Sequence, residues 1–89
     1  MRHTYEEIRA ALSRVVRDNR EARDWSLLDL ARASGAAKST LSKIENGKGD
    51  PCLGTLEKIS TAYGLRIADF FGEIAHVAQR TRELSLRAK

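Results

Sequence analysis

Hydroxyl and ammonium side chains are interleaved in one short stretch of the sequence, GAAKSTLSKIENGKGDP at residues 35–51. A helix advances about 100° per residue, so a helix that starts at Lys38 would gather five polar side chains within about 140° of arc. These are Lys38, Ser39, Ser42, Lys43 and Asn46. Leu41 and Ile44 would fall on the opposite side, toward a core. Short hydroxyls framed by two positive charges can approach a groove closely and hydrogen-bond base edges, so the pattern predicts a surface suited to a nucleic acid.

Side chains that could catalyse a reaction or hold a metal are few and scattered. Cys52 is the only cysteine, and His3 and His76 are the only histidines. One cysteine excludes an internal disulfide, and this set lacks the spacing of a structural zinc site. Lys38-Ser39 has neither the preceding glycine nor the strand that a phosphate-binding loop requires. We therefore expect no enzyme activity, no metal and no cofactor.

The composition is that of one small folded domain with a basic surface. The chain has 89 residues, of which 42% are hydrophobic, enough for one globular domain and too few for two. Sixteen Lys and Arg exceed twelve Asp and Glu, and positive charge gathers over residues 26–49 and in the tail from Arg80, which favours a polyanionic partner. The N-terminus is charged and no apolar run could span a membrane, so we expect a cytoplasmic protein.

Apolar residues recur every three or four positions and nothing alternates as a strand would, which predicts an all-helical fold. Five helices are expected, over about residues 4–23, 26–34, 38–46 and 52–63 and from residue 67 onward. Thr4 with Glu7, and Ser26 with Asp29, have the spacing of capping boxes, and Gly35 suits the end of the second helix. The expected core consists of Ile8, Leu12, Val15, Val16, Leu27, Leu30, Ala31, Leu41, Ile44, Leu53, Leu56, Ile59, Tyr63, Phe70 and Phe71.

The second and third helices, joined by a tight turn at Gly35, have the arrangement of a helix-turn-helix. Over about residues 8–71 the sequence resembles the DNA-binding domain of the Cro and phage-repressor type, the XRE family of bacterial and phage regulators. The resemblance rests on Leu30-Ala31, Gly35, Leu41, Ile44-Glu45, Gly47, Pro51, Leu56 and Phe70-Phe71. It implies a five-helix, lambda-repressor-like domain at residues 1–71, in a cytoplasmic, nucleoid-associated protein, with a helical extension at residues 72–89.

The resemblance also implies roles for individual side chains. The positions that match base contacts are Lys38, Ser39, Ser42 and Lys43. The positions that match phosphate contacts are Ser26, Leu27, Asn46 and Lys48. Arg20 and Glu45 match a salt bridge that joins the first helix to the third. Ala37 replaces the usual serine or threonine cap, which is expected to destabilise the third helix by about 1 kcal/mol. Asn19 replaces a usual leucine. We expect its side chain either to be a hydrogen-bonded buried amide or to lie at the solvated edge of the apolar face of the first helix.

The tail continues the apolar spacing of three and four over three heptads, a pattern suited to packing another helix. Its members are Ile67, Phe70, Ile74, Val77, Thr81, Leu84 and Ala88. We expect this seam to dimerise the protein, because a lone domain covers few bases and operators usually have two half-sites. Gly72 within it weakens the helix by about 1 kcal/mol relative to alanine. The alternatives are that the tail folds over its own domain or frays after about Arg80.

These observations favour a sequence-specific regulator of transcription that binds double-stranded DNA. We expect a repressor that acts as a homodimer, with a recognition helix at about residues 38–46 in the major groove. The alternative is an antitoxin or co-regulator, in which the helix-turn-helix is mainly a scaffold. In that case Leu28 and the tail seam would bind a partner protein.

Overall fold

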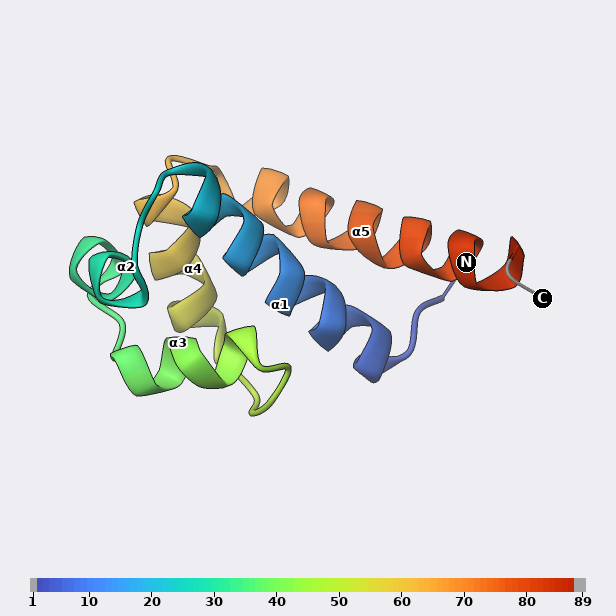
Figure 1. The fold of residues 1–89 in the computed structure, drawn as a ribbon, viewed down its shortest axis with the longest axis horizontal. Helices are drawn as coiled ribbons and strands as arrows, with labels where there is room; N and C mark the ends of the chain where they lie inside the picture. The colour runs from blue at the N-terminus through green and yellow to red at the C-terminus, as the bar shows by residue number, and fades with distance from the viewer. Residues whose placement is uncertain (1, 88–89) are drawn as a thin grey trace.

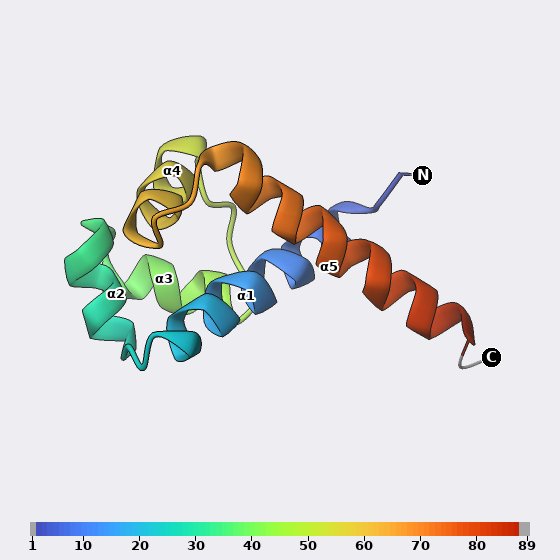
Figure 2. The same ribbon diagram turned by 90° about the horizontal axis from the view of Figure 1, so that it is seen from above.

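The computed structural model describes residues 2–87 and contains five helices and no strand in that range (Figure 1). They are α1 (Tyr5–Ala22), α2 (Leu27–Ser34), α3 (Lys38–Glu45), α4 (Leu53–Ala62) and α5 (Ile67–Arg87). Helices α1 and α5 cross against each other, and α2, α3 and α4 gather at one end of that pair (Figures 1 and 2). The second half of α5 extends beyond the other helices. The prediction of an all-helical fold with five helices is confirmed.

The helix ends follow from local chemistry. Thr4 Oγ1 accepts from the backbone N–H of Glu7, and the Glu7 carboxylate accepts from the N–H of Thr4. Ser26 and Asp29 form the same reciprocal pair at the start of α2. Gly35 ends α2 with φ at 77°, a left-handed conformation that favours a residue without Cβ. Both capping boxes and this stop are confirmed.

The core lies where the five helices converge. Its buried apolar side chains are Ala11, Leu12, Val15, Val16, Leu30, Leu41, Ile44, Ile59, Tyr63, Phe70, Ile74 and Ala78. The Tyr63 hydroxyl donates to the carbonyl of Val16 at 2.7 Å, and the Tyr63 ring stacks on Trp25 with centroids 6.0 Å apart. Burial raises the pKa of Tyr63. The hydroxyl is therefore a neutral donor that ties the end of α4 to α1.

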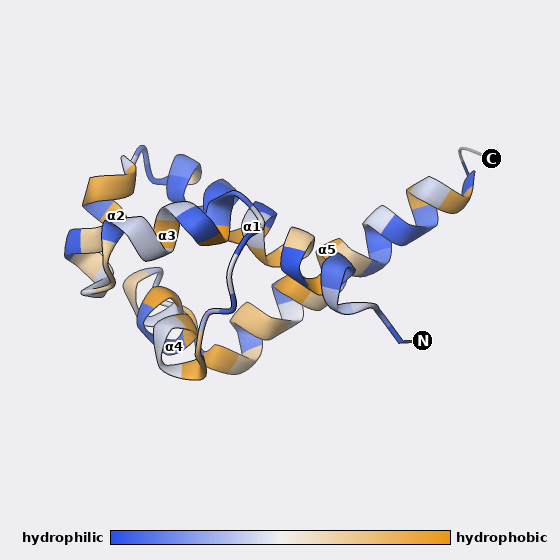
Figure 3. Ribbon diagram, turned by 90° about the horizontal axis from the view of Figure 1, so that it is seen from below, coloured by the Kyte–Doolittle hydropathy of each residue, from blue (hydrophilic) through white to orange (hydrophobic). Residues whose placement is uncertain are grey.

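Three residues expected in the core are exposed instead. Ile8 is 44% exposed, Leu53 is 66% exposed and Phe71 is 41% exposed. Ile8 and Leu53 lie in the first turns of α1 and α4, beyond the layer of helices that would cover them. Phe71 lies about 100° around α5 from the buried Phe70, outside the arc that the other helices reach. In Figure 3 the ribbon at the start of α5 is coloured mainly as hydrophobic.

The structure of α5 corrects the prediction of an apolar dimerisation seam in the tail. Residues 72–87 continue α5 without a break at Gly72, so the expected domain boundary falls inside one helix. Phe70 and Ile74 are buried in this chain's own core and present no surface to a second copy. Of the other seam members Val77 is half-buried, and Ile67, Thr81 and Leu84 are exposed. Ala88 lies outside the described residues. The seam residues Phe70 and Ile74 thus pack against their own domain.

Candidate nucleic-acid interface

Helix α3 is anchored by one face and presents the other. Leu41 and Ile44 are buried at 0% and 3% exposure, and they fix the rotation of the helix about its axis. On the outer face Lys38, Ser39 and Lys43 are exposed and Ser42 is half-buried. The four side chains expected to contact bases therefore share one outer face.

The C-terminal end of α3 is closed by its own residues. Asn46 caps the helix, and its amide Nδ2 donates to the carbonyl of Ser42 at 2.9 Å. The backbone N–H of Lys48 then donates to the carbonyl of Lys43 at 2.8 Å, which folds the loop back under the helix. This turn leaves the Lys48 side chain exposed beside Lys43, around a shallow hollow of about 200 Å³. Asn46, expected at a phosphate, is thus also a helix cap.

The start of α2 supplies backbone donors. Ser26 is exposed, whereas the Leu27 side chain is partly buried against the core. The amides of Leu27 and Leu28, in the first turn, have no carbonyl within the helix to which they can donate. Amides in this position bind phosphate oxygens readily. The adjacent Asp29 has its pKa lowered by its hydrogen bonds with Ser26, so its negative charge persists beside them.

Arg20 joins three elements through one guanidinium group. Its Nε donates to Glu45 Oε2 at 2.8 Å and its Nη2 to Glu45 Oε1 at 2.9 Å, a two-point contact between α1 and α3. Its Nη1 donates to the carbonyl of Trp25 at 2.8 Å, just before α2 begins. The Glu45 hydrogen bond raises the pKa of Arg20. This pair therefore sets the positions of both helices of the helix-turn-helix against α1.

Two further α1 residues bind the end of α3, and the sequence reasoning missed both. Ser13 Oγ donates to the carbonyl of Glu45 at 2.5 Å, and Arg17 Nη2 donates to the same oxygen at 2.6 Å. Arg17 Nε also lies 3.6 Å from Glu45 Oε1. Residues 13, 17 and 20 share one face of α1 because they are spaced by four and three. This spacing is visible in the sequence, but it does not reveal that the three side chains bind the end of α3.

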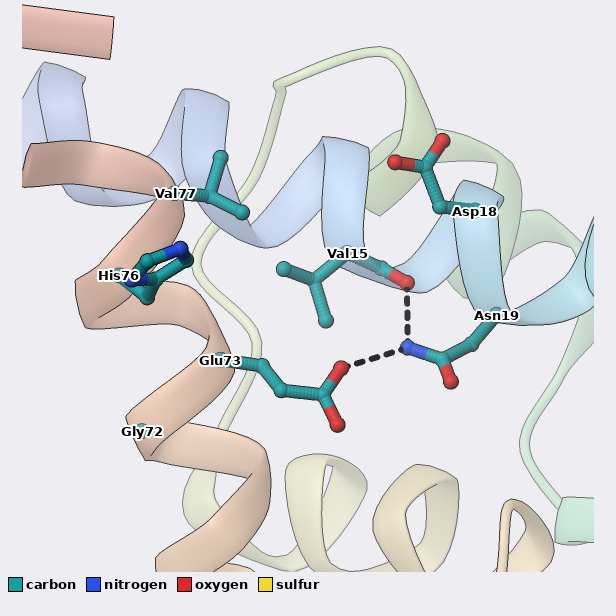
Figure 4. Close-up of a pocket in the computed structure, with 7 residues that line it drawn as sticks. All are labelled: Val15, Asp18, Asn19, Gly72, Glu73, His76 and Val77. Atoms are coloured by element: carbon teal, nitrogen blue, oxygen red, sulfur yellow. Dashed lines mark hydrogen bonds between the residues drawn. The ribbon is translucent and has the colours of Figure 1, made fainter. Parts of the chain in front are cut away.

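Asn19 is a hydrogen-bonded, half-buried amide rather than a solvated edge. Its Nδ2 donates to the carbonyl of Val15 and to Glu73 Oε1, both at 3.0 Å (Figure 4). The contact links α1 to α5 at the side of a hollow of about 400 Å³, which Asp18, His76 and Val77 also line. Its lining polar groups bond to each other or face solvent. We therefore assign Asn19 a role in joining the two long helices.

The residues suited to metal binding do not converge. Cys52 is exposed at the N-terminal end of α4 and its side chain makes no capping hydrogen bond. A hydrogen bond with the Thr55 side chain lowers the pKa of its thiol. Across residues 2–87 no three His, Cys, Asp or Glu side chains gather as a metal ion would require. Within the same range, no helix has the length and the apolar run needed to cross a bilayer.

Comparison with known sequences identifies relatives that regulate transcription. The helix-turn-helix family HTH_3 matches residues 16–70. An uncharacterised HTH-type transcriptional regulator of Mycobacterium tuberculosis is 40% identical over 57 residues, which are 64% of this chain and 22% of the relative. The HTH-type transcriptional regulator SutR of Escherichia coli is 35% identical over 65 residues, which are 73% of this chain and 36% of SutR. The chain thus spans about a fifth to a third of these relatives.

Two solved structures share the fold. The clp gene regulator ClgR from Corynebacterium glutamicum superposes with a TM-score of 0.75 at 28% identity, covering 91% of this chain and 87% of ClgR. An HTH_3 family transcriptional regulator from Vibrio cholerae gives a TM-score of 0.71 at 28% identity, covering 78% and 39% of the two chains. The resemblance drawn from the sequence is confirmed. The chain belongs to the HTH_3 family of DNA-binding, helix-turn-helix transcriptional regulators of the Cro/C1 type.

Proposed function

We propose that this chain represses transcription by binding specific double-stranded DNA sites, with α3 in the major groove. The observation that carries the proposal is the division of α3 into a buried face and an outer face. Leu41 and Ile44 hold the helix from within, so the outer residues cannot rotate away from a ligand. The outer residues are Lys38, Ser39, Ser42 and Lys43.

The outer face of α3 and the residues beside it would make different contacts with DNA, the first with bases and the second with phosphates. Serine hydroxyls can bond to several base edges, and lysine can donate to guanine acceptors, so these side chains read sequence. The amides that begin α2, the Ser26 hydroxyl and the Lys48 ammonium group would bind phosphates on either side of α3. Phosphate contacts set position and affinity without reading sequence. A homodimer would place two copies of α3 on half-sites about 34 Å apart.

Alanine variants of the lysines distinguish base reading from phosphate binding. The variant that carries both Lys38→Ala and Lys43→Ala is expected to lose discrimination between its operator and random DNA. Lys48→Ala is expected to weaken binding to all sequences and to reduce the slope of log K against log salt by about 0.9. Lys58→Ala, an exposed lysine on α4 away from α3, is the matched control.

The measurement is fluorescence anisotropy at several salt concentrations, on duplexes selected from a random pool. Undiminished discrimination by the double variant would contradict the proposal. So would an equal effect of the Lys58 control, because binding would then depend on net charge alone.

A second candidate function is supported by exposed leucines outside the core. Leu28 on α2 is 42% exposed, and Leu84 and Leu86 at the far end of α5 are 55% and 61% exposed. Such residues could bind a partner protein, as an antitoxin or co-regulator would. A stable complex with a second protein, lost in Leu28→Glu or Leu84→Glu, together with no salt-sensitive DNA binding, would favour this function over the first.

A further inference from the structure

The outer face of α3 carries hydrogen-bond donors that the described part of the chain does not use. Lys38 and Lys43 end in ammonium groups, which donate hydrogen bonds and cannot accept them. Both side chains are exposed, and among residues 2–87 neither ammonium group is paired with a carboxylate. Helix α3 lies on the side of the molecule away from α5 (Figure 1), so these donors face outward from the fold.

The hydroxyl of Ser42 is also arranged as a donor. Asn46 Nδ2 donates to the carbonyl of Ser42 at 2.9 Å and lies 3.5 Å from Ser42 Oγ, which accepts from it. The Ser60 hydroxyl donates to the carbonyl of Glu57 in its own helix, but the Ser42 hydroxyl donates to no acceptor in the described part of the chain. The Ser42 proton is therefore available to an acceptor outside the protein.

Acceptors are scarce on the same face. Glu45 carries the one carboxylate of α3, and both of its oxygens accept from Arg20. The amide hydrogens of Asn46 are turned toward Ser42. Asn46 thus cannot make the combined donor and acceptor contact by which an asparagine reads adenine. A duplex that meets the outer face of α3 meets mainly donors.

The bases differ in what their edges offer to a surface of donors. In the major groove guanine presents two adjacent acceptors, N7 and O6, and one ammonium group can donate to both. Adenine presents one acceptor beside a donor, thymine presents one acceptor beside a methyl group, and cytosine presents only a donor. The outer face of α3 is therefore matched best by guanine.

We propose that α3 recognises a pair of guanines, one bound by Lys38 and the other by Lys43, with the Ser42 hydroxyl donating to a base between them. This inference rests on the proposed function and names the bases that the outer face reads. The two lysines are five residues apart, which is about 7.5 Å along the helix axis. Base pairs are stacked about 3.4 Å apart, so the two guanines lie about two base pairs apart, on either strand.

Modified bases test these contacts atom by atom. Duplexes that the full chain enriches from a random pool are expected to contain two guanines at this spacing. Replacing either guanine by 7-deazaguanine, which lacks the N7 acceptor, is expected to raise Kd roughly 5-fold. Inosine keeps N7 and O6 and lacks only the amino group in the minor groove, so it is expected to leave Kd nearly unchanged. Fluorescence anisotropy at one fixed salt concentration measures both.

Glutamine variants test which lysine meets which guanine. A glutamine amide can accept from adenine N6 and donate to adenine N7. Lys38→Gln is therefore expected to change the preferred base from guanine to adenine at one position and to retain guanine at the other, and Lys43→Gln to do the reverse. Lys58→Gln, at an exposed residue of α4, removes the same charge and is expected to change neither base. Circular dichroism melts verify that each variant is folded.

Three results would overturn the inference. They are an enriched site without the pair of guanines, a Kd that inosine raises and 7-deazaguanine does not, and glutamine variants that both keep guanine at both positions. Failure of the proposed function gives a different result. In that case no sequence would be enriched over random DNA, and this inference would fail with it.

Discussion

Two arginine–glutamate pairs hold α1 to the rest of the molecule, one near each of its ends. Arg20 binds Glu45 through Nε and Nη2 at 2.8 and 2.9 Å. Arg82 binds Glu7 in the same two-pronged way, with its Nε 2.9 Å from Glu7 Oε2. The pairs differ in depth, because Glu45 is 7% exposed whereas the Glu7 side chain is 30% exposed.

The difference in depth matches a difference in what each pair holds. Glu45 also receives Ser13 and Arg17 on its carbonyl, so the end of α3 is fixed at several points. Arg82 instead donates to the carbonyl of Arg2, and it thereby holds the second half of α5 to the N-terminal segment. The buried pair positions the helices proposed to read DNA, and the exposed pair tethers the end of α5. Removing one partner should therefore be far more damaging at the first site than at the second.

Glu45→Gln should have the largest effect. Glutamine keeps the shape of the side chain but leaves Arg20 without its counter-charge, and breaking a buried pair in this way destabilises a protein by about 3–5 kcal/mol. Urea denaturation followed by circular dichroism gives the free energy of unfolding. Glu6→Gln, at an exposed glutamate of α1, serves as the control and should change little. A loss below 1 kcal/mol would show that the pair does not hold α3.

Arg20→Lys should have the next largest effect. Lysine preserves the charge, but it cannot bridge both Glu45 oxygens and the Trp25 carbonyl at once. We expect a loss of about 2 kcal/mol, since hydrogen bonds to charged groups are worth about 1.5–3 kcal/mol. The same denaturation experiment measures it. Stability equal to that of the unaltered protein would mean that charge alone, without the fork geometry, fixes the two helices.

The buried pair could be predicted from the sequence, and the exposed pair could not. Arg20 and Glu45 belong to a family resemblance, and the two capping boxes were predicted because each depends on two residues three positions apart. Glu7 and Arg82 are 75 residues apart, and no local pattern connects them. Their pairing depends on the angle at which α5 crosses α1, which spacing does not encode.

Apolar periodicity predicted which face of each helix turns inward but not how wide the covered arc is. It placed Leu41 and Ile44 correctly, because neighbouring helices cover both sides of α3. It failed at Ile8, Leu53 and Phe71, where an apolar residue lies at the edge of the arc or beyond the last covering helix. The same limit explains why the inner face of α5 was taken for a dimer seam. The base contacts of α3 stay a prediction, since they depend on a ligand.

Ala37→Ser should have a smaller effect, in the stabilising direction. The pair of Arg20 and Glu45 fixes the end of α3, whereas its start has no side-chain cap because Ala37 offers no acceptor. A serine hydroxyl can accept from the amides of the first turn, which is worth about 1 kcal/mol. The free energy of unfolding should rise by that amount. Ala33→Ser, exposed within α2, provides the control and should give no gain.

Glu7→Gln should have the smallest effect at neutral pH and a clear effect in acid. The hydrogen bond from Arg82, together with the backbone N–H of Thr4, lowers the pKa of Glu7 from its usual 4.5 to about 2. Because the folded pKa is depressed, the carboxylate stabilises the fold fully above about pH 4.5, and this contribution is lost as the pH falls toward 2. Glutamine retains one oxygen that can accept from the Thr4 N–H. Its NH2 group replaces the other oxygen, so the variant removes the charge and one of the two hydrogen bonds from Arg82.

Melting temperatures between pH 2 and pH 7 measure this contribution. The unaltered protein should lose stability more steeply below pH 4.5 than Glu7→Gln, and the two curves should converge toward pH 2. Some slope should remain in the variant, because hydrogen bonds with Ser26 also lower the pKa of Asp29. Parallel curves would show that Arg82 does not hold Glu7 in solution. The end of α5 would then be free of the N-terminal segment, and α1 would be held to α5 near its C-terminal end, where Asn19 binds Glu73.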